Sequence, residues 1–412
     1  MNKRWTGTLA DSDSDHDAGF VIDDKKFVPF SQMDDVFSRS FWDDRIRTDK
    51  SDTFYSTYRR PLAVWRKARG FRRRDYALRN AAWHVADVFA EMGEETDRRD
   101  GFLDPLSQLR EASTERDDVG SPGEATQDLK KVATTLGADL VGVTGFDPRW
   151  QYTERFSQGT GKPKSNDIGT NLPSVIVIGQ AMDPELIATA PSALAGAATG
   201  LGYSFDAVVL LTIAQYIRNL GYRAVPSMND TALAIPYAVK AGLGEYARNG
   251  LVITPEYGSS LRFGKIFTDL PLEHDVPRRF GVKEVCEICH RCSDACPSNA
   301  IPAGEPSDQK LNQSTIAGVT KWTVDGEKCF NYWTKINSDC AVCIRSCPYT
   351  RDYSRWHNRS WLRLAGSPLR RLALWIHDRS GGGERTSSND WWTATSGTPV
   401  ALTDKPTNSA SP

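Results

Sequence analysis

A run of four cysteines, C-E-I-C-H-R-C-S-D-A-C-P at residues 286 to 297, is the feature that most restricts what this chain can fold into. A second run, at residues 340 to 348, repeats its C-x2-C-x3-C-P ending. All eight cysteines of the 412-residue chain lie in these runs or at position 329, and the first 285 residues contain none. Thiols gathered in this way predict a metal-binding domain over residues 281 to 350.

The spacing of these cysteines favours iron–sulfur clusters. C-x2-C-x2-C-x3-C-P is typical of bacterial ferredoxins, in which the fourth cysteine of the run binds the other of two clusters. The sequence therefore predicts two 4Fe-4S clusters in a ferredoxin-like arrangement. We assign Cys286, Cys289, Cys292 and Cys347 to one cluster, and Cys296, Cys329, Cys340 and Cys343 to the other.

Two other uses of the cysteines fit less well. A disulfide framework suits a small secreted chain, whereas this one is long and concentrates its cysteines in two runs. Structural zinc takes four ligands as two separated pairs and would leave the matching Cys-Pro endings unexplained.

Composition and charge exclude some partners. The chain is 39% hydrophobic and 25% charged, ordinary values for a globular protein of two or three domains. Its formal net charge of -1 gives no general signal for nucleic acid. No apolar run approaches the roughly 18 residues that would span a bilayer, so we expect no transmembrane segment. The first twenty residues do not resemble a secretory signal, and we expect a cytoplasmic protein.

The part of the chain before the core is polar and basic. Residues 1–25 include D-S-D-S-D-H-D and are predicted to be disordered. Residues 26–125 are predicted to form a helical and irregular region that packs on the core, with a helix over residues 75 to 92. We interpret its many arginines as a solvated helix face rather than a phosphate site. A polar stretch at residues 115 to 126 marks the boundary.

Residues 126–280 alternate between amphipathic and continuously apolar segments. Helices are predicted at residues 128–138 and 205–220, the second with Ser204 as its N-cap, and strands at 139–145, 173–182 and 222–228. This pattern indicates an α+β fold, with an α/β-like core buried on both faces of its sheet. Residues 351–412 are predicted to form one short helix and a polar tail.

The residues also carry a resemblance. The segment from L-G-Y-S-F-D at position 201 to L-E-H-D at 275, the two cysteine runs, and R-R-D-Y-A-L-R-N-A-A-W at 73 resemble the reductive dehalogenases. The resemblance covers about residues 72 to 392. It implies a nitroreductase-type corrinoid-binding core with a ferredoxin-like two-cluster insert. It also implies cobalamin bound with no protein histidine on cobalt, and removal of halide from an organohalide.

The resemblance implies three catalytic residues. Tyr203 matches the family's tyrosine and would donate a proton, Arg262 would stabilise its phenolate, and Asn229 would orient substrate or halide. Each also has a purely structural interpretation. Tyr203 could pack against a helix start, Asn229 could cap a turn, and Arg262 could pair with a surface acid.

The corrinoid contacts are expected in the glycine-rich segment 241 to 258, where glycine allows a chain to lie close to a large cofactor. The glycines could equally serve helix ends and turns. Trp333 is a candidate for a wall of the substrate cavity. The predicted contacts are Gly242, Gly244, Arg248, Asn249 and Gly250.

The predicted function is reductive dehalogenation of a small organohalide, with electrons from an external low-potential ferredoxin, flavodoxin or reductase. Two alternatives stay open. An epoxyqueuosine reductase would act on tRNA and would carry an aspartate in place of Tyr203. An electron-transfer protein would contain the two clusters and no corrinoid.

Overall fold

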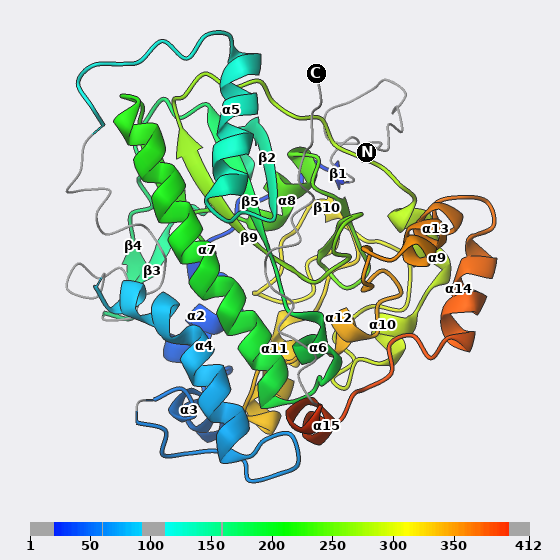
Figure 1. Cartoon of the computed structure of the whole chain (residues 1–412). Helices are drawn as coiled ribbons and strands as arrows, with labels where there is room; N and C mark the ends of the chain where they lie inside the picture. Colours follow the sequence, from blue (N-terminus) through cyan, green and yellow to red (C-terminus); the bar gives the residue numbers. More distant parts are fainter. Residues whose placement is uncertain (1–19, 60, 93–111, 158–159, 395–412) are drawn as a thin grey trace.

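The computed structural model describes residues 20–59, 61–92, 112–157 and 160–394 (Figure 1). At its centre lies a four-stranded antiparallel sheet with strand order β2-β5-β9-β6. β5 and β9 are almost wholly buried, which explains the apolar run of β5, whereas β9 also carries Arg262 and Lys265. The strands are β2 (Leu140–Gly145), β5 (Ser174–Ala181), β9 (Leu261–Thr268) and β6 (Ala224–Ser227).

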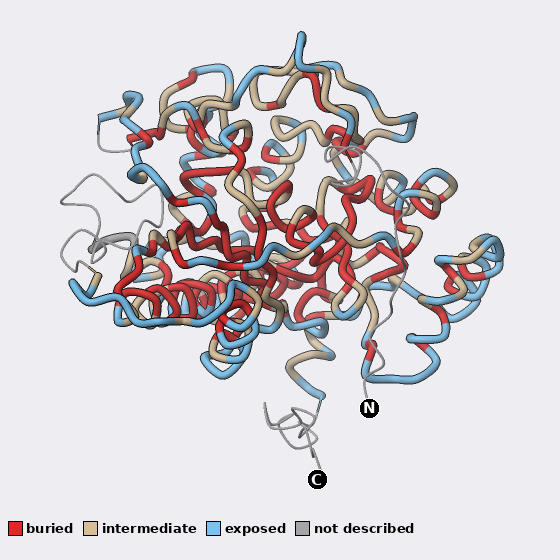
Figure 2. Tube along the Cα trace, turned by 90° about the horizontal axis from the view of Figure 1, so that it is seen from above, coloured by how far each residue is buried: buried red, intermediate tan, exposed pale blue. Residues whose placement is uncertain are grey.

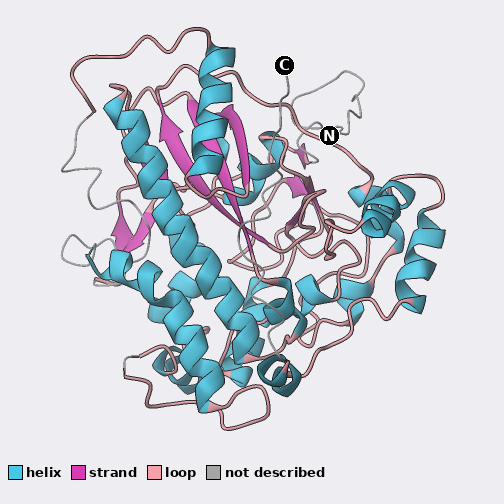
Figure 3. Cartoon of the chain, viewed as in Figure 1, coloured by secondary structure: helices cyan, strands magenta, loops and turns pink. Residues whose placement is uncertain are grey.

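Helices cover both faces of this sheet. α5 and α7 pack over one face and α8 over the other, and α4 lies alongside α7 (Figures 1 and 3). Figure 2 shows the buried segments gathered in the interior and exposed segments at the periphery. The predicted α+β core is therefore present. Its helices are α4 (Arg73–Met92), α5 (Pro122–Thr135), α7 (Ala193–Asn219) and α8 (Ala234–Lys240).

α7 begins twelve residues before the predicted helix, at Ala193 rather than at residue 205. Its N-cap is Ser192, whose side chain accepts a hydrogen bond from the N–H of Ala195 at 3.1 Å. The predicted cap, Ser204, lies in mid-helix, where its hydroxyl donates to the carbonyl of Ala82 in α4 at 2.6 Å. The prediction was wrong because the first half of α7 is rich in alanine and glycine and lacks a strong apolar stripe.

The glycines of α7 are explained by close packing. A Cβ on Gly200 would lie 2.5 Å from the indole of Trp83 in α4, and one on Gly202 would lie 2.7 Å from Cγ of Arg262 in β9. Glycine within a helix costs about 1 kcal/mol relative to alanine. Here it allows two large side chains to approach the helix axis.

α7 is also the one helix among the described residues that is long and apolar enough to cross a membrane. The prediction that no apolar stretch reaches that length was therefore wrong, because small residues extend the apolar segment. In the structure 61% of its most apolar window is buried, against the sheet and α4.

The cysteine region repeats one local structure. In the first run the N–H of Ala295 donates to the carbonyl of Arg291, and in the second the N–H of Ser346 donates to that of Val342. The two short helices that contain these turns pack together. The helices of this region are α9 (Val282–Ile288), α10 (Arg291–Asp294), α11 (Gly326–Ile336) and α12 (Val342–Arg345).

The N-terminal part differs from its prediction. Phe20 is buried, and β1 (Val21–Ile22) pairs with β10 (Val319–Thr320), so residues 20–25 are ordered; residues 1–19 lie outside the described part. These residues find an apolar surface next to the core that the local sequence does not reveal. α5 begins inside the predicted boundary stretch because Ser121 and Glu124 form a capping box and Pro122 follows the cap. The other elements before the core are η1 (Gln32–Asp34), α2 (Val36–Trp42) and α3 (Asp49–Ser56).

After the second cysteine run the chain forms three helices, not the predicted single helix and polar tail. They are α13 (Trp356–Ala365), α14 (Arg370–Arg379) and α15 (Ser388–Thr393), and residues 395–412 lie outside the described part. α13 buries Trp361 beside the first cysteine run, a long-range contact that sequence pattern alone does not indicate. The remaining short elements are η3 (Pro148–Trp150), β3 (Arg155–Ser157), β4 (Lys162–Lys164), α6 (Pro184–Ala188), β7 (Glu245–Tyr246) and β8 (Val252–Ile253).

Candidate active site and cluster-binding region

The structure brings the eight thiols into two groups. Burial raises the pKa of Cys292 to about 12, and Cys347 and Cys289 add to that shift. Burial likewise raises the pKa of Cys329 to about 12, with further contributions from Cys340 and Cys296. Cys286 has Cys347, Cys292 and Cys289 among its electrostatic neighbours. Cys343 has Cys340, Cys329 and Cys296 among its own, together with Cys292 of the first group, so the two groups adjoin each other. This grouping matches the predicted ligand sets, whose assignment to clusters stays a prediction.

The chemistry of these groups fits iron–sulfur clusters. Thiols with raised pKa values are costly to ionise, and coordination to iron removes that cost because the metal binds the thiolate. No three His, Cys, Asp or Glu side chains in the described parts of the chain are arranged to hold a single metal ion. A cubane requires a wider spacing, since each thiolate binds a different iron atom.

The three predicted catalytic residues converge on one phenol oxygen. Tyr203 comes from the middle of α7, Arg262 from β9 and Asn229 from the loop after β6. Both the guanidinium of Arg262 and the amide of Asn229 donate hydrogen bonds to the hydroxyl oxygen of Tyr203. The guanidinium also lies 4.1 Å from the centre of the tyrosine ring. Trp83 of α4 stacks on the tyrosine ring, with 4.6 Å between the ring centroids.

Burial raises the pKa of Tyr203 above its usual value, while Arg262 and Asn229 act in the opposite direction. The phenol is therefore protonated at neutral pH. A phenol oxygen has two lone pairs and one O–H donor. The two hydrogen bonds from Arg262 and Asn229 use the lone pairs and leave the O–H proton available to a third partner.

A second layer of buried charge lies behind this cluster and was not anticipated. Asp206 is one turn after Tyr203 on α7, and burial raises its pKa to about 7, against the lowering effects of Arg262 and Lys265. Burial lowers the pKa of Lys265 on β9 to about 8, with Asp230 and Asp206 opposing the shift. The ammonium of Lys265 donates to the carbonyl of Met228, beside Asn229. The available signal was a lone lysine in the apolar strand L-R-F-G-K-I-F-T.

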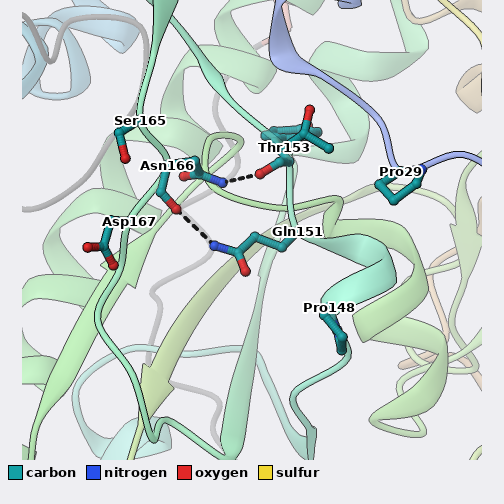
Figure 4. A pocket seen from close by; sticks show the side chains of 8 residues that line it. Pro29, Pro148, Gln151, Thr153, Ser165, Asn166 and Asp167 are labelled. Carbon is teal, nitrogen blue, oxygen red and sulfur yellow. Dashed lines mark hydrogen bonds between the residues drawn. The ribbon is translucent and has the colours of Figure 1, made fainter.

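An open depression of about 400 Å³ is lined by residues that include Gln151, Tyr152 and Asn166 (Figure 4). The side chain of Asn166 donates to the carbonyl of Tyr152 at 2.7 Å, and that of Gln151 donates to the carbonyl of Asn166 at 2.9 Å. The hydroxyl of Tyr152 in turn donates to the carbonyl of Asn229 at 3.2 Å. These hydrogen bonds therefore help to position Asn229.

A large cavity, about 1350 Å³, lies between the core and the cysteine region. Met182 at the end of β5 and Ser260 before β9 line its core side, and residues 350–354 after the second cysteine run line the other. Ser260 is two residues from Arg262, and Met182 borders Gly202, the neighbour of Tyr203. The cavity is therefore adjacent to the tyrosine cluster. Its wall includes Arg278, Arg345, Arg351, Arg359 and Arg363.

The predicted corrinoid contacts have structural roles and do not line this cavity. Gly242 and Gly250 adopt positive φ angles of +68° and +78°, and a Cβ on Gly244 would lie 2.1 Å from the carbonyl oxygen of Ile253. Arg248 is buried and donates to the carbonyls of Cys286, Pro302 and Gly304, so it secures the first cysteine run to the core. Their contact with a corrinoid stays a prediction.

Two other predicted residues face inward. The side-chain oxygen of Asn249 accepts from the N–H of Leu251 at 3.2 Å within a turn. Trp333 packs against Phe37 and Phe54 in an aromatic cluster between α11 and the N-terminal helices. Its place in a substrate cavity stays a prediction.

Comparisons with known proteins identify both regions. Residues 159–272 match the family model "Reductive dehalogenase subunit", and residues 285–350 match a "4Fe-4S dicluster domain". The second match spans all eight cysteines and confirms the predicted domain type.

Curated relatives agree with these matches. The chain is 34% identical to the tetrachloroethene reductive dehalogenase of Sulfurospirillum multivorans over 301 residues, which is 67% of this chain and 60% of the relative. It is 36% identical over 271 residues to the enzyme of that name from Desulfitobacterium hafniense, covering 56% of this chain and 49% of the relative. This chain therefore spans about half to three fifths of the length of these relatives.

A solved structure confirms the fold. A catabolic reductive dehalogenase superposes on 89% of this chain with a TM-score of 0.68 at 21% identity, and the match covers 48% of that protein. The family model, the curated relatives and the fold therefore all match the reductive dehalogenase family.

Proposed function

We propose that this chain catalyses cobalamin-dependent reductive dehalogenation of a small organohalide. The curated relatives are tetrachloroethene reductive dehalogenases, and one neighbour of the same fold, with a TM-score of 0.66, is described with a mechanism for B12-dependent dehalogenation. The reaction replaces a carbon–halogen bond with a carbon–hydrogen bond. It consumes two electrons and one proton and releases halide.

The observation that carries the proposal is the phenol oxygen of Tyr203 with its two donors. Tyr203 is protonated at neutral pH and has its O–H free, so it can supply the proton that the reaction requires. Arg262 remains cationic and stabilises the phenolate left after transfer. Asn229 shares that role and stays exposed, so its amide can also meet a substrate or a departing halide.

The large cavity suits a corrinoid in size and charge. Pockets for drug-sized ligands measure about 300 to 1,000 Å³, and this one is larger at about 1350 Å³. Its wall contains the carboxylates of Glu256, Asp352 and Glu384, and Arg278 pairs with Glu256 at 3.4 Å. The other arginines of the wall, Arg345, Arg351, Arg359 and Arg363, could bind the phosphate and amide oxygens of a nucleotide tail. Bound there, cobalamin would supply the reduced cobalt that breaks the carbon–halogen bond.

Electrons would reach the cavity through the cysteine region. Cys347 has Ser259 as a hydrogen-bond partner, and the next residue, Ser260, lines the cavity. The cluster held by the first cysteine group would thus be the one next to the cofactor. An external low-potential donor would reduce the clusters.

The test is halide release from tetrachloroethene by anaerobically prepared protein with cobalamin and reduced methyl viologen. We expect release that depends on protein and cobalamin and falls by about 10² to 10⁴ in Tyr203→Phe, the usual range for loss of a general acid. The variant must retain the iron and corrinoid content of the wild type. Full activity in such a variant would contradict the role of Tyr203.

A second candidate has one supporting observation. An epoxyqueuosine reductase from Lactococcus garvieae is 34% identical over 130 residues, but this match covers only 30% of the chain. Turnover of an epoxyqueuosine-containing tRNA stem-loop, with no halide released from tetrachloroethene or from a brominated phenol, would favour that candidate.

A further inference from the structure

The segment before α4 is the most basic part of the chain. Residues 59–74 contain eight arginines or lysines and no aspartate or glutamate. Six of the described cations are exposed, and five of them define a cationic surface, which consists of Arg66, Lys67, Arg69, Arg73 and Arg74. None of the five forms an ion pair with a carboxylate in the part of the chain that the structure describes.

Aromatic rings hold several of these cations in place. The guanidinium of Arg66 lies 4.9 Å from the ring centre of Phe71, and that of Arg73 lies 5.5 Å from Trp65. Arg74 lies 4.8 Å from Trp392 of α15. Such contacts fix a guanidinium without neutralising it. The arginines of this region were predicted to form a solvated helix face. Arg73 and Arg74 do lie on α4, whereas Arg66, Lys67 and Arg69 precede it.

The cationic surface lies over the second group of cysteines. Trp65 and Ala68 pack in one apolar cluster with Tyr332 and Cys340. This cluster connects the segment that carries the cations to the second cysteine group. Figure 1 shows the segment that leads into α4 at the same end of the molecule as α11 and α15.

The two cysteine groups differ in their access to solvent. Cys286, Cys289, Cys292 and Cys347 are buried, with exposed fractions of 6 to 8%. The members of the second group, Cys296, Cys329, Cys340 and Cys343, are more exposed than these, although burial still raises the pKa values of all but Cys296. Electron transfer falls steeply with distance, so a donor in solution reaches the second group more readily.

We propose that the cationic surface is the docking site for a small acidic electron-carrier protein, which reduces the cluster of the second cysteine group. The inference rests on the proposed function, which requires an external donor. Each encounter would oxidise the carrier by one electron and reduce the cluster by one, so two encounters supply one dehalogenation. Complementary charge raises the encounter rate of two proteins, and electron-transfer interfaces are typically small.

A second exposed surface supplies the matched control. α14 presents Leu372 and Trp375 to solvent beside Arg371 and Arg379, and Arg371 lines an open depression with Ile288 of the first cysteine run. It has arginines too, but it lies next to the buried cysteine group. Reversing two charges there changes the net charge of the protein by the same amount.

The test compares Arg66→Glu/Arg73→Glu with Arg371→Glu/Arg379→Glu in full-length protein loaded with its clusters. Stopped-flow absorbance would follow cluster reduction by a reduced acidic ferredoxin at low salt. We expect the second-order rate constant to fall by about 10-fold or more in the first variant, because steering by charge is worth 10- to 10³-fold. It should change little in the second variant and in Arg66→Lys/Arg73→Lys.

Three further readouts complete the test. High salt should remove the difference between the first variant and the wild type, because it screens exposed charges. Reduction by methyl viologen, a small cation, should not slow in the first variant. Iron content should match the wild type in every variant.

The proposal is overturned by an unchanged ferredoxin rate in the first variant, or by an equal loss in the α14 variant. It is also overturned if the first variant loses only binding to an RNA stem-loop or to anionic vesicles. The proposed function is scored separately by halide release with viologen as reductant. If halide is released but the rate of reduction by ferredoxin does not depend on Arg66 and Arg73, only the docking site is contradicted. If that rate depends on these charges but no halide is released, only dehalogenation is contradicted.

Discussion

The cysteine region and the tyrosine site are assembled in different ways. Seven of the eight cysteines lie in two runs of at most eleven residues, and short turns set their spacing. Tyr203, Asn229 and Arg262 come from a helix, a loop and a strand, and meet only because α7 packs across β9. One region is specified by local spacing and the other by packing of the core. Changes in the two regions should therefore have different effects.

The largest expected effect is the loss of a cluster. Cys292→Ser removes a predicted ligand of the first cluster, so iron should fall from about eight atoms per chain towards about four. The Tyr203 site should remain folded, because its contacts come from the core. His290→Ala, a non-ligand in the same run, is the control and should retain all the iron. A full iron count in Cys292→Ser would show that the ligand assignment is wrong.

The next effect concerns the buried carboxyl behind the tyrosine. Burial raises the pKa of Asp206 to about 7 from an ordinary value near 3.8. The Asp206 carboxyl therefore binds a proton more tightly in the folded state than in the unfolded state. This difference stabilises the folded state below about pH 4, and the stabilisation is lost as pH rises to about 7. Asp206→Asn removes this dependence. Between pH 4 and pH 7, the free energy of unfolding of the variant should rise by roughly 4 kcal/mol relative to that of the wild type.

Urea unfolding at several pH values measures this difference. Asp275→Asn is the control, because that carboxyl is half-exposed and pairs with Lys130 at 2.5 Å. A difference between wild type and Asp206→Asn that stays flat from pH 4 to pH 7 would show that Asp206 is not held in a proton-retaining environment.

The smallest effect tests the packing that brings Tyr203 to Trp83. A Cβ on Gly200 would lie 2.5 Å from that indole, so Gly200→Ala should cost about 1 to 3 kcal/mol and displace the ring that stacks on Tyr203. Gly304→Ala is the control, because a Cβ there meets nothing within 4 Å. Equal unfolding midpoints in urea for these two variants would show that α4 and α7 do not pack this closely.

The same contrast explains how much could be predicted from the sequence. The cluster domain could be predicted because ligand spacing is a local property, and β2, β5 and β6 of the core because their segments are largely apolar. β9 was not predicted, because Arg262, Gly264 and Lys265 interrupt its apolar residues. The candidate catalytic residues were indicated by family resemblance, and not by any local pattern around Tyr203. Asp206 and Lys265 were missed because a buried charge is recognised only once its surroundings are known.

One helix boundary was predicted wrongly for a physical reason. The start of α7 was misplaced because its glycines serve contact with Trp83 and Arg262, which are distant in sequence. The glycines at 242 and 244 have structural roles, in a tight turn and in a close approach of the backbone, and their contact with a corrinoid stays a prediction. A glycine in the sequence can indicate close contact, but the sequence does not show whether the contact is with a side chain, the backbone or a cofactor.

The central claim is that a corrinoid site and two iron–sulfur clusters coexist in this chain. Metal and corrinoid analysis of protein purified without oxygen, from a host supplied with cobalamin, tests it most directly. The account predicts about one cobalt and about eight iron atoms per chain, the count for two cubanes. Eight iron atoms without cobalt, in soluble and folded protein, would contradict it and would favour an electron-transfer protein.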